Sequence, residues 1–250
     1  MAKVFRFYLV AAGKYHNIDF ARLELLKLIA EEEHYRVEVA DDYSNIEAIK
    51  AADVLITYTC DLIPTEEEQK GLQEFLNSGK KWFALHGTNS ILRFLDDGRV
   101  DCPDEAPLFM QMLGSQFAAH PPIMPYTVEV SQGAQDNPLV QGVEPFEVDD
   151  ELYCAHLHGE NTPLLETRWN GMAEGFVEDD WTEGDGRHLV MYTHPYGNGE
   201  VLYLTLGHCR GKYDMQPMVD EYPNIEEGSW AQPVFYDLLR RGMRYCTGEL

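Results

Sequence analysis

Basic residues are scarce in this sequence. Among its 250 residues, 19 Lys and Arg face 43 Asp and Glu, which gives a formal net charge of −24. A surface this acidic repels phosphate backbones and anionic lipid headgroups, so neither nucleic acid nor a membrane surface is an expected partner. Solubility or salt adaptation explains the charge better than a specific cationic partner, because the acidic residues are spread along the whole chain.

Long apolar runs, phosphate-binding glycine loops and paired cysteines are missing as well. No stretch reaches the roughly 18 consecutive apolar residues of a transmembrane helix. Neither GxGxxG nor GxxxxGK[ST] occurs, so no nucleotide cofactor is expected. The 5 cysteines are widely spaced without a CxxC pair, which argues against a disulfide framework and a thiolate zinc site. Because the N-terminus does not resemble a signal peptide, we expect a cytoplasmic location.

Strand and helix patterns alternate in the N-terminal part of the chain. Apolar runs predict strands at Phe5–Ala12, Tyr35–Ala40, Val54–Tyr58 and Lys81–Leu85. Helical spacing predicts intervening helices at Phe20–Glu33, Ser44–Lys50 and Thr65–Asn77, with caps at Asp19, at Ser44 with Glu47, and at Thr65 with Glu68. This alternation predicts an α/β fold whose central sheet is mostly parallel and covered by helices on both faces.

The remainder of the chain is less regular. It contains a predicted helix at Ala106–Leu113, strands at Tyr126–Val130, His188–Tyr192 and Glu200–Leu206, and a closing helix at Ala231–Cys246. Stretches 149–156 and 178–186 are predicted loops with short strands. Without repeats, low-complexity segments or linkers, residues 1–250 are expected to form a single domain.

Histidines gather where the ligand site of such a sheet should lie, beyond the carboxyl ends of its strands. His86 occupies the turn after a buried strand, where an enzyme can present a nucleophile; an isolated histidine there would more often just cap the next helix. His16, His120 and His208 also occupy strand ends or loops. Together these imidazoles could bind a divalent metal such as zinc, or act as general acid and base.

Other polar motifs carry a weaker signal. His156 and His158 form an HxH pair, for which a structural or surface role is favoured. The acidic run Val148–Glu151 is interpreted as a solvated face, because acidic residues occur along the whole chain. Tyr153 is one of several aromatics in loop-like positions that can stack on sugar rings, although core packing is the commoner role.

Several short motifs, in order, resemble the trehalose-utilisation (ThuA-like) family, which shares the fold of class I glutamine amidotransferases. They are Ala84–Gly87, Leu113–Phe117 continuing into His120–Pro122, Phe146–Tyr153, Gly197–Tyr203 continuing to Leu206–His208, and the closing helix Pro233–Gly248. The resemblance implies a flavodoxin-like, doubly wound core. It also implies a pocket over the strand ends and a role in the use of disaccharides such as trehalose, through keto sugars.

The amidotransferase relation implies a changed reaction. Those enzymes carry a cysteine at the elbow, activated by a histidine near a later strand end; here the elbow residue is His86, and His208 falls near the place of that histidine. Cys60 follows a different strand and cannot substitute for the missing thiol. Without a thiolate the glutaminase mechanism has no nucleophile, so we expect no glutaminase activity.

Two functions from different classes are consistent with these residues. One is an enzyme acting on a disaccharide or keto-glycoside, with His86, His208 and Glu151 in catalysis and Tyr153 and His120 binding substrate. In this reading the metal ligands are His16, His86, His120 and His208. The alternative is a non-catalytic sugar-binding or regulatory protein with a degenerate amidotransferase pocket. In either case the partner is a small carbohydrate, and a homo-oligomer is expected.

Overall fold

The computed structural model describes residues 3–250, in which nine strands form one mixed sheet in the order β2-β1-β3-β4-β15-β14-β11-β8-β9. The parallel strands are β1 (Phe5–Gly13), β2 (Tyr35–Ala40), β3 (Val54–Cys60), β4 (Lys81–Leu85) and β15 (Gly199–Leu204). The antiparallel strands are β14 (Arg187–Tyr196), β11 (Thr162–Arg168), β8 (Met124–Val130) and β9 (Phe146–Asp150). The expected α/β fold is confirmed.

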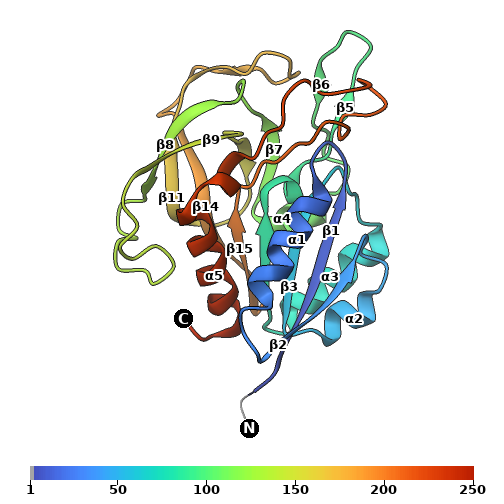
Figure 1. Cartoon of the computed structure of the whole chain (residues 1–250), viewed down its shortest axis with the longest axis vertical. Helices are drawn as coiled ribbons and strands as arrows, with labels where there is room; N and C mark the ends of the chain where they lie inside the picture. Colours follow the sequence, from blue (N-terminus) through green and yellow to red (C-terminus); the bar gives the residue numbers. More distant parts are fainter. Residues whose placement is uncertain (1–2) are drawn as a thin grey trace.

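The helices cover both faces of the parallel strands (Figure 1). They are α1 (Ile18–Ile29), α2 (Ile46–Ala51), α3 (Glu66–Asn77), α4 (Pro107–Leu113) and α5 (Pro233–Thr247). Along β1, Phe7 and Leu9 join the core under α1 and α5, whereas Tyr8 and Val10 join the core under α2, α3 and α4. Burial on both faces explains why this strand is an almost continuous apolar run.

Two of the three predicted helix starts are wrong in detail. The predicted box of Thr65 and Glu68 does cap α3, with both reciprocal hydrogen bonds present. In contrast, α1 is capped by Asn17, whose side chain accepts from Phe20 N at 3.1 Å, and it ends at Ile29 rather than Glu33. α2 is capped by Asn45 rather than Ser44. An asparagine next to the predicted cap satisfies the free N–H groups just as well, so sequence alone places the start only within a residue or two.

Short strand pairs and a long loop flank the carboxyl ends of the parallel strands. The pairs are β5 (Arg93–Phe94) with β6 (Val100–Asp101), β7 (Ser115–Ala119) with β10 (Cys154–Leu157), and β12 (Gly171–Met172) with β13 (Asp180–Trp181). Figure 1 shows the β5–β6 hairpin and the loop that precedes α5 at the same end of the molecule as the end of β1. Among the helices of residues 3–250, none has the length and apolar composition to cross a membrane.

Candidate functional site

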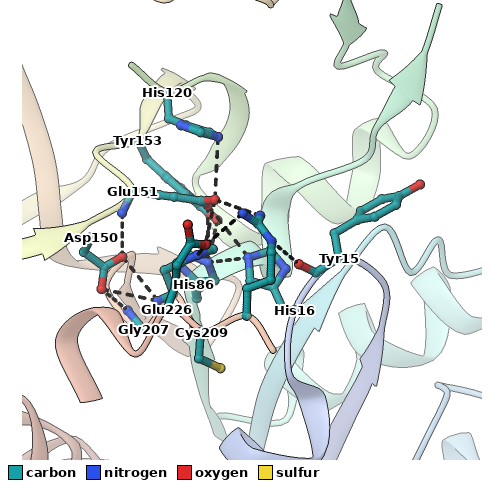
Figure 2. Close-up of polar contacts among 12 residues, drawn as sticks. Tyr15, His16, His86, His120, Asp150, Glu151, Tyr153, Gly207, Cys209 and Glu226 are labelled. Carbon is teal, nitrogen blue, oxygen red and sulfur yellow. Dashed lines mark hydrogen bonds and ion pairs between the residues drawn. The ribbon is translucent and has the colours of Figure 1, made fainter. Parts of the chain in front are cut away.

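Four buried side chains converge at this end of the sheet: His16, His86, Glu151 and His208, with one ligand atom of each within 4.8 Å of all the others. His16 follows β1, His86 follows β4, His208 lies beyond β15, and Glu151 directly follows β9 from the antiparallel half. Figure 2 shows the imidazoles of His16 and His86 and the Glu151 carboxylate directed toward one another. Parallel strand ends meet at one edge of a sheet, which is why residues so distant in sequence can assemble here.

Two of these imidazoles face each other through unprotonated nitrogens. His86 Nδ1 lies 2.8 Å from the Thr205 carbonyl oxygen, and His16 Nδ1 lies 3.2 Å from the Lys14 carbonyl oxygen. A carbonyl can only accept, so each Nδ1 carries the proton and each neutral ring leaves Nε2 bare. The two Nε2 atoms are 2.8 Å apart. Such lone pairs repel each other unless a cation or a shared proton lies between them.

Burial supports the neutral form of both rings. Desolvation lowers the pKa of His16, and it lowers that of His86 well below the usual histidine range, where the neighbouring His16 adds to the effect. His86 is only 1% exposed, so the turn buries this imidazole and does not present it at the surface. Its backbone has φ 45°, a left-handed conformation that is uncommon for residues other than glycine.

His208 and Glu151 form the charged part of the cluster. His208 Nδ1 lies 3.1 Å from Glu151 Oε1, and its Nε2 lies 2.8 Å from the Glu226 carboxylate. Burial lowers the pKa of His208, but the two carboxylates outweigh it and raise the value to about 9. Burial raises the pKa of Glu151, yet His208 and His120 hold it well below the usual range. Glu151 is therefore ionised, and its burial contradicts the reading of residues 148–151 as a solvated face.

This donor set fits a divalent metal ion. His16 Nε2, His86 Nε2, His208 Nδ1 and the Glu151 carboxylate are nitrogen and oxygen ligands of the kind that zinc takes. The second nitrogen of each ring is held by an acceptor, namely Lys14, Thr205 or Glu226, as in known metal-bound histidines. Moreover, His208 Nδ1 makes no hydrogen bond within the part of the chain that the structure describes. His120, also predicted as a ligand, lies outside the group.

Supporting residues that the sequence analysis missed surround the cluster. The Arg210 guanidinium lies 3.4 Å from Glu151 Oε1 and 2.9 Å from Glu226 Oε2, and its Nε donates to the Tyr15 carbonyl. Arg210 follows the predicted His208 by two positions, so a search around that histidine could have found it. Glu226 lies in the long loop before α5, where no spacing or motif marks it.

A cavity of about 280 Å³ opens onto the cluster. The predicted substrate-binding residues both line it: His120 Nε2 lies 3.6 Å from Glu151 Oε1, and the Tyr153 hydroxyl lies 3.3 Å from His86 Nε2. Ser90, which was not predicted, also lines the cavity, and its buried hydroxyl has no hydrogen-bond partner within residues 3–250. His156 lies apart at the surface, where it pairs with Glu178.

A comparison with known protein families tests the family resemblance that the sequence motifs indicated. A family model described as ThuA, trehalose utilisation, matches residues 7–221. The chain belongs to this family. The match includes every cluster residue, whereas α5 and the loop residue Glu226 lie after it. No curated protein matches the chain.

Solved structures share this fold. A ThuA-like protein from Bacteroides uniformis has a TM-score of 0.67 at 17% identity, with 98% of this chain and 93% of that chain covered. A ThuA-like protein from Parabacteroides merdae has a TM-score of 0.60 at 16% identity, with 99% and 92% covered. A β-galactosidase from Rahnella has a TM-score of 0.55 at 12% identity. That match covers 100% of this chain and 32% of the β-galactosidase chain. At these identities the likeness shows the fold alone.

Proposed function

We propose that this ThuA-family protein is a carbohydrate-metabolism enzyme that acts on a disaccharide or keto-glycoside through a divalent metal ion, such as zinc, held by the histidine cluster. One observation carries the proposal: the bare nitrogens of His16 and His86 converge at 2.8 Å beside the ionised Glu151. The two lone pairs and the Glu151 carboxylate supply the donor atoms that a cation requires, and binding of the cation would displace the proton that His208 otherwise holds.

The ligands would be His16, His86, His208 and Glu151. The second ring nitrogen of each histidine already lies within hydrogen-bond distance of a carbonyl or carboxylate oxygen, which would hold the ring in place. When bound, the ion supplies Lewis acidity, which polarises a carbonyl or a glycosidic oxygen. A Lewis acid of this kind suits both proton removal beside a keto group and hydrolysis of the activated glycosidic bond, the two reactions that a keto-glycoside allows.

The remaining cavity residues supply binding and proton transfer. His120 donates Nδ1–H to the Pro121 carbonyl at 2.7 Å, which leaves Nε2 toward Glu151 and the cavity to accept or return a substrate proton. The hydroxyls of Tyr153 and Ser90 can each hydrogen-bond a sugar hydroxyl. Because Ser90 Oγ has no partner within residues 3–250, a bound sugar would satisfy it.

Metal content and turnover test the proposal together. Protein purified without a metal-affinity tag should contain about one equivalent of a divalent metal per chain. It should also convert a glucoside or its 3-keto derivative, including keto-trehalose, with products followed by chromatography. Glu151→Gln should abolish turnover, whereas Glu147→Gln, on the exposed face of the same strand β9, should leave metal content and turnover unchanged.

Two results would contradict the proposal. A metal-free protein that retains full turnover would remove the metal from the mechanism. A protein that binds sugars without converting any glucoside or keto-glucoside would support a non-catalytic sugar-binding role instead.

A further inference from the structure

The cavity has two chemically different parts. Its floor is polar and buried, and consists of His16, Glu151, Ser90 and Tyr153, with Arg210 beside them. Its outer part carries apolar side chains, defined here as the apolar wall: Leu92, Phe94, Val100, Phe117, Phe176 and Met215. Exposure increases along this wall, from Phe117 at 3% to Phe94 at 43%. When a ligand reaches the cluster, its outer portion therefore lies against the apolar wall.

The apolar wall is held together by its own contacts. The Tyr15 and Phe94 rings meet edge to face at 5.1 Å, and the Phe117 and Phe176 rings meet at 5.8 Å. Val100 pairs with Phe176 through an isolated bridge, which ties the β5–β6 hairpin to the segment between β12 and β13. Since the wall is braced by contacts within the protein itself, an apolar ligand group needs little reorganisation to occupy it.

Hydrogen-bonding groups are few along the same wall. The polar side chains along the wall are Tyr15, Glu174 and His120, whose imidazole lies 5.0 Å from the Phe176 ring. The Tyr15 hydroxyl points away from the histidine cluster in Figure 2. A second sugar ring placed here would bury several hydroxyls with few partners, and a buried hydroxyl without a partner is unfavourable. An aromatic or alkyl group makes no such demand and gains from leaving water.

We propose that the site takes glycosides with an apolar aglycone, aryl or alkyl, in preference to disaccharides. This inference rests on the proposed carbohydrate function and specifies its substrate class. The glycone lies on the polar floor, where Ser90 and Tyr153 contact its hydroxyls, and the aglycone lies against the apolar wall. Phe94 is a specificity-determining residue, since it is the most exposed side chain of the wall and contacts only the aglycone.

Isothermal titration of the protein as purified tests this assignment. The probes are the α and β anomers of methyl and phenyl glucoside, together with trehalose. For the preferred anomer, phenyl glucoside should bind at least about tenfold more tightly than methyl glucoside or trehalose. Phe94→Ser should bring the phenyl-to-methyl ratio close to unity without changing the affinity for methyl glucoside.

A matched control is available on α1. Leu23 is also a large exposed apolar side chain, at 52%, and it does not line the cavity, so Leu23→Ser should change neither affinity. Equal affinities for phenyl and methyl glucoside, or tightest binding of trehalose, would overturn the apolar-aglycone assignment while leaving the carbohydrate function standing. Absence of binding for every glucoside would overturn both.

Discussion

At the scale of single residues, His86 combines three constraints that few positions share. It begins the turn after β4, it has a positive φ of 45°, and its ring is 1% exposed between His16, Tyr153 and the Thr205 carbonyl. Glycine follows it because a Cβ at position 87 would lie 2.8 Å from the Thr59 carbonyl oxygen. The turn therefore fixes where the imidazole can point.

Replacing the His86 imidazole should lower both the content of bound metal and the free energy of unfolding. We expect His86→Ala to lose the bound metal, because one of the converging nitrogens disappears. We also expect it to lower the free energy of unfolding by about 1–3 kcal/mol, because the buried Thr205 carbonyl loses its donor. Elemental analysis and urea unfolding measure both quantities. His156→Ala, at the surface histidine, should change neither, and full metal retention by His86→Ala would contradict the assignment.

His208 should make the metal-free protein sensitive to alkaline pH. Its folded pKa is raised from 6.5 to about 9 because Glu151 and Glu226 outweigh the effect of burial. A raised folded pKa stabilises the protein fully below about pH 6.5, and this contribution is lost as pH rises through about 9.

Unfolding of chelator-treated protein from about pH 6 to about pH 10 checks this sign. Since a ligand nitrogen must be unprotonated, metal affinity should increase over the same interval, with release of a proton. Flat stability and proton-free metal binding across that interval would contradict the assigned charge of His208. Glu226→Gln should shift the transition to lower pH, because one of the carboxylates that hold the proton is gone.

At the scale of elements, the last residue of β9 joins three segments of the site. The buried Asp150 carboxylate accepts from the backbone N–H groups of Glu151, Gly207, His208 and Ser229. It thereby fixes the end of an antiparallel strand to the loop after β15 and to the turn before α5. Asp150 therefore helps to set the relative position of Glu151 and His208.

Removing the charge of Asp150 should loosen the three segments that its carboxylate joins. Asp150→Asn replaces one acceptor oxygen by a donor NH₂ group, which leaves buried N–H groups without a partner. We expect the free energy of unfolding to fall by about 2–4 kcal/mol and metal affinity to fall with it. Asp149→Asn, at the exposed neighbouring position, should leave both unchanged. Equal behaviour of the two variants would show that Asp150 does not hold the site together.

At the scale of the whole molecule, the fold presents a cavity and a buried histidine cluster at its strand ends, where the elbow carries no thiol. His86 stands at the elbow, and burial raises the pKa of the Cys60 thiol well above its usual value. A neutral buried thiol is a poor nucleophile. We therefore expect no release of ammonia from glutamine, measured with a coupled glutamate assay. Glutaminase activity that Cys60→Ser abolishes would overturn this expectation.

The parallel half of the fold, and the edge of the sheet at which a site could form, can be predicted from the amino-acid sequence alone. The spacing of apolar residues and the position of a strand end are local properties of the sequence. A few adjacent residues are therefore enough to infer β1 to β4, the α3 cap and the location of His86. The same strand-end argument also located His208, which follows the strand predicted at Glu200–Leu206. Helix starts at α1 and α2 were missed by one or two positions, because neighbouring polar residues cap equally well.

The composition of the cluster depends on contacts between residues that are distant in sequence, and it becomes visible only in the folded chain. The acidic run 148–151 has the composition of a solvated face, yet Asp150 and Glu151 are 1% and 3% exposed because β9 ends against the loop that carries His208. The tautomers of His16 and His86 depend on carbonyls of Lys14 and Thr205, and Glu226 reaches His208 from a loop without any motif. Burial and charge depend on neighbours that are distant in sequence, and local pattern carries no information about them.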